Sequence, residues 1–184
     1  IAHYREKPRG GTEIWRLDAD GNVRVASPSE TAYGDRGVYD IDRGILVLKG
    51  RRLRLESTDG QVTARDSLEY WEGRRMAVAR GAAYAREGQN QIWADILSVY
   101  LHEDAQGKTV MQRVEAFDKV RIETPQDVVV GDLGLYNLDS RTAILCRGVT
   151  IVRGDDRLSG QVAEVNLATG RARLRPGRCA FTVK

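Results

Sequence analysis

The residues of this chain that could do chemistry are carboxylates gathered in short polar segments. These segments read DADG, DIDRG, HEDAQG and RGDDR. Carboxylates stacked along a parallel β-helix can cleave polysaccharides, so the segments raise the question of a glycan-cleaving enzyme. The same residues are typical of turns, where Asp hydrogen-bonds to its own downstream backbone. Turn chemistry therefore accounts for them, and we expect no catalytic residue and no enzyme.

Other reactive constellations are missing from the sequence. There is no GxSxG or HExxH motif, and no Gly-rich loop opens a helix. His3 and His102 are far apart, and Cys146 and Cys179 do not form a CxxC pair, so we expect neither a metal site nor another cofactor. The two cysteines could form a disulfide or lie separately in strands as small hydrophobic residues.

Composition excludes two further classes of partner. The chain has 29 Lys and Arg against 26 Asp and Glu, and its net charge of +3 is spread along the 184 residues. No face interleaves these cations with aromatic residues, as single-stranded nucleic-acid binding requires, so no nucleic acid is expected. No apolar run approaches the roughly 18 residues of a membrane span. A hydrophobic content of 41% is enough for a core.

The sequence contains a long internal repeat. Residues 34–42 read GDRGVYDID and residues 131–139 read GDLGLYNLD, and an alignment of residues 1–42 with 98–139 has 13 identities without a gap. Such self-similarity is the mark of a repeat architecture. We therefore expect a single elongated domain over residues 1–184 made of two tandem copies, about 1–97 and 98–184.

A shorter period of about 30 residues lies inside the long one. Similar turn signals recur, and Asp118 stands where the other units have Gly. The positions are Gly21, Gly50, Gly81, Asp118, Gly148 and Gly177.

Between these positions apolar residues alternate, as in NVRVAS, RLRLES, SLEYWE and KVRIET, which indicates strands with one buried face. The best helix candidate, residues 92–101, alternates almost as well. The sequence predicts units of two short strands and two turns, stacked into a long sheet that folds over on itself.

The repeated phrase has its own interpretation. Gly34 and Asp35, like Gly131 and Asp132, suit a tight turn, because Gly tolerates a positive φ. After that turn, alternation places Tyr39 and Ile41 on one face, as it does Tyr136 and Leu138. A tyrosine repeated at one depth of a β-fold is either core or the lining of an apolar cavity, and the pattern alone leaves both open.

Several long stretches resemble one known family. The order and spacing of these phrases are similar to the OstA-like proteins, the LptA family of lipopolysaccharide transport, from about residue 5 to 175. The phrases are LDADGNVRV, ARGAAYAREGQNQIWADILSVYL, VEAFDKVRIETP and GDLGLYNLDSRTAILCRGVTIVRGDDRLSGQVAEVNLATGRARL. The resemblance implies an antiparallel β-jellyroll with an apolar interior, working in the periplasm after removal of an upstream signal peptide, with no catalysis.

The resemblance also implies a cargo and a site. The cargo is lipopolysaccharide, whose lipid A acyl chains would contact Tyr39 and Tyr136 in the interior, and Ile41 and Leu138 follow from strand alternation. The further inferred lining positions are Val23, Val25, Leu53, Leu55, Val120, Ile122, Val149 and Ile151. Arginines outside the interior, among them Arg51, Arg52 and Arg54, would suit the phosphates.

The resemblance implies protein partners as well: other copies of the chain, joined head to tail, and related jellyrolls of the inner- and outer-membrane complexes. Edge strands expected at residues 12–25 and 162–174 would make these contacts. Because residue 1 falls inside a repeat, we expect further residues upstream. Two alternatives stay open: another jellyroll component of the same pathway, either inner-membrane anchored or the translocon's N-terminal domain, and a structural β-solenoid or adhesion module without lipid.

Overall fold

The protein is all-β, as predicted. A computed structural model describes residues 1–184 except 29, 59, 104–108 and 180–184. Its strands form one antiparallel fourteen-stranded sheet. The strands are β1 (Ala2–Glu6), β2 (Thr12–Ala26), β3 (Glu30–Asp40), β4 (Ile45–Lys49), β5 (Leu53–Ser57), β6 (Gly60–Ala64), β7 (Ser67–Trp71), β8 (Met76–Glu87), β9 (Asn90–Glu103), β10 (Thr109–Glu123), β11 (Val128–Asn137), β12 (Thr142–Arg153), β13 (Asp156–Asn166) and β14 (Arg171–Arg175), and one 3-10 turn, η1, spans Glu72–Arg74.

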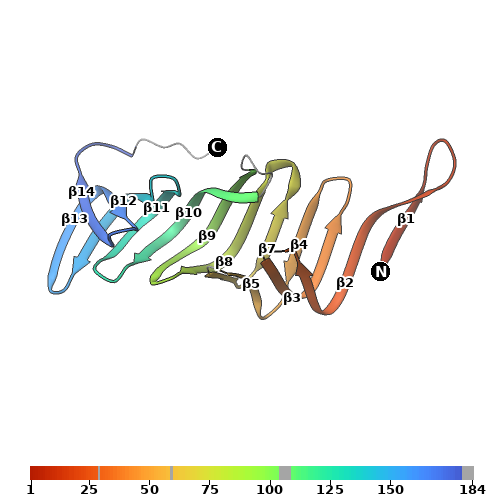
Figure 1. Ribbon diagram of the computed structural model, residues 1–184, viewed down its shortest axis with the longest axis horizontal. Coiled ribbons are helices and arrows are strands. Elements are labelled where there is room, and N and C mark those ends of the chain that lie inside the picture. The colour runs from red at the N-terminus through yellow and green to blue at the C-terminus, as the bar shows by residue number, and fades with distance from the viewer. Residues whose placement is uncertain (29, 59, 104–108, 180–184) are drawn as a thin grey trace.

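The order of strands in the sheet follows the order in the chain. From β1 to β3 and from β8 to β14 each strand pairs with the next, so the strands succeed one another along the long axis from β1 at one end to β13 and β14 at the other (Figure 1). Between β3 and β8 two short strand pairs replace single long strands: β4 with β7, and β5 with β6. This region is the only interruption of the ladder order in the described part of the sheet.

Every second long strand is bent by a two-residue bulge. The pairing register shifts around residues 21–22 in β2, 81–82 in β8, 118–119 in β10 and 147–148 in β12. All eight residues have positive φ, between 44° and 81°. A bulge of this kind turns a strand sharply while pairing continues on both sides. Each long strand therefore contributes its first half to one layer and its second half to another.

The bulges show that four of the turns predicted from the sequence, at Gly21, Gly81, Asp118 and Gly148, are bends within strands. The positions singled out in the sequence do have positive φ, including Gly50 at 147° and Gly177 at 112°. In β2, β8, β10 and β12, however, the chain bends within a strand and does not reverse. The predicted short strands over residues 22–27 and 119–124 are the second halves of β2 and β10. Asp118 adopts φ 60°, so the loss of Gly does not change the bend.

The glycines of the repeated phrase lie within strands, so the prediction of a tight turn at them is wrong. Gly34 and Gly37 belong to β3, and Gly131 and Gly134 to β11, and none of them has positive φ. Glycine is needed here because side chains approach too closely. A Cβ on Gly134 would lie 3.3 Å from both Ala116 Cβ and Val120 Cγ1. This close packing at the bend explains why both copies of the phrase have glycine at the same spacing.

The 97-residue offset relates matching strands. β2 and β10 begin at residues 12 and 109 and end at 26 and 123, so both bounds are 97 apart. Each then pairs with a strand that carries the repeated phrase, β3 or β11. The two regions are alike in local structure, but they occupy different places in the sheet.

The core lies between the two layers. One apolar cluster joins residues from both sides of the bends, such as Ala116 with Ile122 and Leu145 with Ile151. A second cluster lies on the outer face and contains Leu133, Cys146 and Val162. Cys146 and Cys179 form a disulfide with a Cα–Cα distance of 5.7 Å, which joins the segment after β14 to this outer cluster. The sequence left open whether Cys146 and Cys179 form a disulfide, and in the structure they do.

A buried carboxylate holds the C-terminal end of the sheet together. Asp127 is 1% exposed. Its oxygens accept hydrogen bonds from Arg153 Nε at 2.6 Å and Nη2 at 2.7 Å, and from the Ala172 backbone N–H at 2.5 Å. The bonds from Arg153 and Ala172 outweigh the effect of burial and lower the pKa of Asp127. The turn before β11 is thereby fixed to β12 and β14.

Replacing Asp127 with Asn should destabilise the protein by about 2 kcal/mol at pH 7, because a charged acceptor of three bonds is lost while Arg153 keeps partial access to water. The pKa is depressed in the folded state, so the contribution is complete above the unfolded value of about 3.9 and is lost as pH falls through the folded value. Urea unfolding should show the gap between the two proteins closing below about pH 4. A gap that persists at low pH, or an equal loss in Asp155→Asn, would contradict this assignment.

Substituting Gly134 with Val should cost about 1–3 kcal/mol, because the new side chain would overpack against Ala116 and Val120. Gly73→Val is the matched control, since a Cβ at Gly73 meets nothing within 4 Å. We expect the control to change stability by less than about 0.5 kcal/mol in the same denaturation assay.

Candidate functional site: the apolar interior and its seam

The interior of the sheet is lined by rows of apolar residues that run from strand to strand in each layer. Cross-strand partners project from the same face, so the register identifies each row. The first, which we call the tyrosine row, runs from β1 to β14. Its members are Ala2, Leu17, Tyr39, Leu46, Tyr70, Ala77, Val99, Val114, Tyr136, Ala143, Val165 and Ala172.

Three further sets of partners complete the lining. A second row lies between the tyrosine row and the bends: Ala19, Gly37, Leu48, Leu68, Ala79, Leu97, Ala116, Gly134, Leu145, Ala163 and Leu174. In the other layer, which we call the valine layer, one row contains Val25, Ala32, Leu55, Val62, Ala85, Ile92, Ile122, Val129, Ile151 and Leu158. Next to the bends stand the pairs Val23 with Gly34, Leu53 with Ala64, Ala83 with Ala94, Val120 with Gly131, and Val149 with Gly160.

Most of the residues proposed from the sequence belong to these rows. Tyr39 and Tyr136 are in the tyrosine row. The remaining strand positions lie in the valine layer: Val23, Val25, Leu53, Leu55, Val120, Ile122, Val149 and Ile151. All eight pack in or against the main core cluster.

Ile41 and Leu138 lie outside the rows. Each follows the last residue of its strand, so the alternation that pointed to them does not extend that far. The Ile41 backbone N–H donates to the Trp15 carbonyl, and the side chain is 38% exposed. The Leu138 N–H donates to the Gln112 carbonyl in the same way. Both residues lie in hairpins at the strand ends of the layer that contains the tyrosine row.

Tyr70 is a row member that the sequence reasoning missed. It lies on β7 between Leu46 and Ala77, and it places a third aromatic ring in the tyrosine row. The alternation of Leu68 and Tyr70 within SLEYWE was the available signal. β7 carries no copy of the repeated phrase, so the repeat does not point to Tyr70.

The two repeated tyrosines differ in their surroundings. The Tyr39 hydroxyl donates to Glu72 Oε1 at 2.7 Å, and this bond, with burial, raises the pKa of Tyr39. The pKa of Tyr136 is raised chiefly by burial, with the Glu87 carboxylate adding to the shift. Both side chains therefore remain neutral phenols near neutral pH. Each can present its ring to the interior and its hydroxyl to the edge of the layer.

In the C-terminal half the two layers are joined along their free ends, which we call the seam. The hairpin between β13 and β14 makes the contacts. Asn90 Nδ2 donates to the Leu167 carbonyl at 3.1 Å, and Thr124 Oγ1 donates to the Gly170 carbonyl at 2.7 Å. The hydrogen bond from the Ala172 backbone N–H to Asp127 is a third contact along this seam. Val149 and Val165, which lie behind this seam, are 1% and 0% exposed.

In the N-terminal half the seam is not bonded. Among the described residues, no hydrogen bond or ion pair joins the hairpin ends at 27–30 and 57–60 to those at 41–44 and 72–75. The inward-facing side chains are also less covered. Leu17 is 40% exposed, whereas Val114, its counterpart 97 residues later, packs against the core. The same lining is thus open at one end of the protein and filled by its own side chains at the other.

The sheet edges differ from the predicted ones. At the N-terminal end β1 covers residues 12–17 of β2, so only the second half of β2 lies at the edge. At the C-terminal end β14 covers residues 162–166 of β13. The outermost strands are therefore β1 and β14, each of five residues.

Comparison with known proteins identifies the architecture. The family described as "LptA/(LptD N-terminal domain) LPS transport protein" matches residues 61–171, more than half of the chain. The chain belongs to this family. The match extends from β6 to the start of β14 and so includes both sides of the bonded seam. The resemblance noted in the sequence is confirmed.

A solved member of the transport system supports the family's fold for this chain. It is LptH of Pseudomonas aeruginosa, the LptA-homologous periplasmic component of the lipopolysaccharide transport device, with 18% identity and a TM-score of 0.52. The similarity covers 64% of this chain and 81% of that one. At this identity it shows a shared OstA-like jellyroll. A comparison with curated proteins finds no match. No helix in the described part of the chain is long and apolar enough to cross a membrane.

The difference between the two halves can be measured with one substitution made twice. Val23 and Val120 are 97 residues apart, and Val23 is half-buried whereas Val120 is 1% exposed. We expect Val120→Ala to cost about 2 kcal/mol and Val23→Ala less than about 1 kcal/mol in urea unfolding, since a cavity forms only where the neighbours are closed. Equal losses would mean that the N-terminal interior is packed as tightly as the C-terminal one.

Proposed function

We propose that the protein carries lipopolysaccharide across the periplasm by holding the lipid A acyl chains against its apolar rows, without making or breaking a bond. The observation that carries this proposal is the continuity of the tyrosine row, which extends from β1 to β14 without a charged residue. Membership of a lipopolysaccharide transport family supports it.

The rows suit movement better than storage. Each methylene transferred from water to an apolar surface contributes about 0.8 kcal/mol, so several acyl chains would be held strongly. A deep pocket would then trap the lipid. Rows of similar residues repeated from strand to strand offer positions of nearly equal energy, and a lipid can pass between them without a large barrier.

The two halves take different parts in this mechanism. Acyl chains enter the N-terminal half, where Leu17 and Tyr39 are partly exposed and the seam carries no bonds among the described residues. Passage through the C-terminal half requires the hairpin between β13 and β14 to separate from Asn90, Thr124 and Asp127. The lipid would then replace the protein's own side chains as contacts of the interior.

The proposal also includes contacts with other jellyroll proteins and a periplasmic location. The outermost strands β1 and β14 have unpaired edges that can add a strand from another copy or from a related jellyroll of the membrane complexes. The disulfide between Cys146 and Cys179 is consistent with the oxidising periplasm. The matched family includes both LptA and the N-terminal domain of LptD, and the role we propose for this chain is that of a bridge component between the two membrane complexes.

Photocrosslinking to lipopolysaccharide tests the proposal. A photoreactive residue at Tyr39, Tyr70 or Tyr136 should form adducts, and one at Asp40, which follows Tyr39 and faces the other side of β3, should not. We expect the strongest adducts at Tyr39, because the seam near Tyr136 is bonded. Folded variants that give no adduct at any tyrosine, or equal adducts at Asp40, would instead favour a structural solenoid whose interior admits no lipid.

A further inference from the structure

The C-terminal end of the sheet leaves half of a strand without a partner on one side. β14 pairs with residues 162–166 of β13, whereas residues 156–160 pair only with β12 in the described part of the chain. Leu158 lies in this stretch, belongs to the lining of the valine layer and is 53% exposed. An unpaired strand edge beside an exposed apolar side chain is a template for the addition of another strand.

A proline explains why β14 stops before it reaches this edge. Arg147 and Gly148 bend β12 into the valine layer, and both have positive φ. The residues 29 positions later are Pro176 and Gly177. The proline ring fixes φ at about −65°, so the two-residue bend cannot form there. β14 therefore ends at Arg175 and contributes only to the layer of the tyrosine row.

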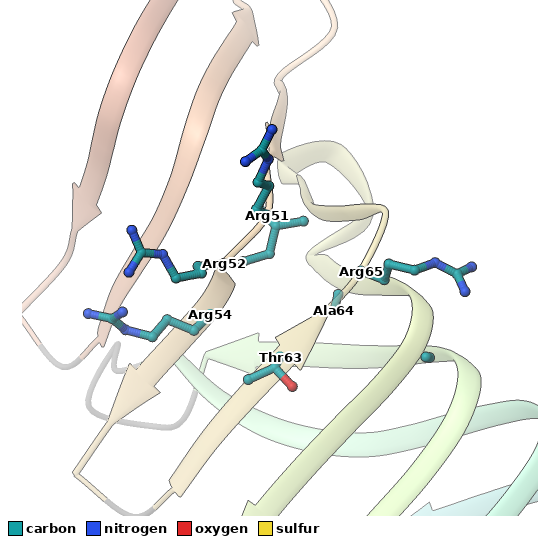
Figure 2. Close-up of a pocket in the computed structure, with 8 residues that line it drawn as sticks. Arg51, Arg52, Arg54, Thr63, Ala64 and Arg65 are labelled. Atoms are coloured by element: carbon teal, nitrogen blue, oxygen red, sulfur yellow. The ribbon is translucent and has the colours of Figure 1, made fainter.

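β4 and β5 show that the chain can change layers without such a bend. β4 ends at Lys49, and β5 pairs with residues 30–33 of β3 in the valine layer. Gly50, Arg51 and Arg52 connect the two strands, and Figure 2 shows Arg51 and Arg52 on this crossing, directly before β5. Three residues are thus enough to carry the chain from one layer to the other.

After β14 the chain takes a different course. Cys179 forms the disulfide with Cys146, which lies on the outer face of β12, two strands away from β14. Cys179 packs there against the outer cluster that contains Leu133 and Val162. In Figure 1 the chain after β14 turns back from the end of the sheet. The disulfide therefore holds Arg178 and Cys179 away from the free edge of β13.

We propose that the residues after Pro176 are a displaceable edge strand, which the disulfide keeps off residues 156–160 of β13 so that a strand of a second jellyroll can pair there. In the dithiol form the same residues cross between the layers, as the chain does from β4 to β5, and cover the edge themselves. The inference rests on the proposed function for the identity of the partner.

The change between the two forms is a two-electron thiol–disulfide exchange with a dithiol reductant. A thiolate of the reductant attacks the sulfur of Cys179, which is less buried than Cys146, and the S–S bond breaks. Both cysteines end as thiols with two protons taken up, and the reductant becomes a disulfide. Two residues then link the released segment to β14, so its effective concentration at the edge exceeds that of a partner strand.

Two double variants of the full chain separate loss of the disulfide from covering of the edge. Arg178→Ser/Cys179→Ser removes the disulfide and leaves a segment that can pair. Arg178→Pro/Cys179→Pro removes the same charge and the same sulfur. Consecutive N–H groups of a strand point to opposite sides, so one of the two prolines removes a ladder donor in either register. The proline variant is thus the matched control.

Hydrogen exchange, at a concentration where the protein is monomeric, measures the edge directly. The edge-facing backbone N–H groups of residues 156–160 should exchange at least about tenfold more slowly in the serine variant than in the oxidised wild type. The proline variant should exchange as fast as the wild type. Equal rates in all three proteins, or the same change in both variants, would overturn the inference.

Sedimentation at higher concentration tests the consequence for assembly. The oxidised wild type and the proline variant should associate equally, and the serine variant, or wild type treated with dithiothreitol, should associate at least about fivefold more weakly. Equal association despite slowed exchange would overturn control of assembly by the disulfide. Monomers throughout would overturn the strand partner named here and in the proposed function, whereas crosslinking at Tyr39 would still decide the lipid carrier.

Discussion

The bend in every second long strand is the constraint on which the rest of the structure depends. Two consecutive residues with positive φ turn β2, β8, β10 and β12 through the same corner while the pairing to neighbouring strands continues. Backbone hydrogen bonding is therefore kept, and one long sheet forms two layers without a separate connection. The apolar face of every strand is directed to the space between the layers, and its residues align into rows across the sheet.

The same repeat has opposite outcomes at the two ends. Thr124 and Asp127 bond to Gly170 and to Ala172 of β14, whereas the side chain of Ser27, the counterpart of Thr124 97 residues earlier, bonds only to Glu30 in its own turn. A closing hairpin exists at one end of the sheet only. This difference makes the C-terminal interior a packed core and leaves the N-terminal interior partly exposed, although the lining residues are similar.

A surface along which a lipid moves must attract its acyl chains, but it must bind them about equally at every point along its length. The tyrosine row meets this requirement because its members are apolar or amphipathic and none offers a charge to a passing chain. The interrupted region between β3 and β8 is the exception. There the two layers are made by separate short strand pairs, β4 with β7 and β5 with β6.

The sequence by itself determined the strand class, the repeat, the positions of positive φ and ten inward-facing residues of the rows. These properties are local: alternation marks one face of a strand, and a positive φ is preferred by particular residues at particular spacings. It did not reveal that Gly34 and Gly131 are required by close packing, that Tyr70 joins the tyrosine row, or that Cys146 pairs with Cys179. Nor did it show that Ile41 and Leu138 fall beyond their strands. Register, layer packing and closure of the seam were decided only by the tertiary structure, because they depend on which distant strand ends meet. The bond between Thr124 and Gly170 joins residues 46 positions apart, and no local pattern encodes such a contact.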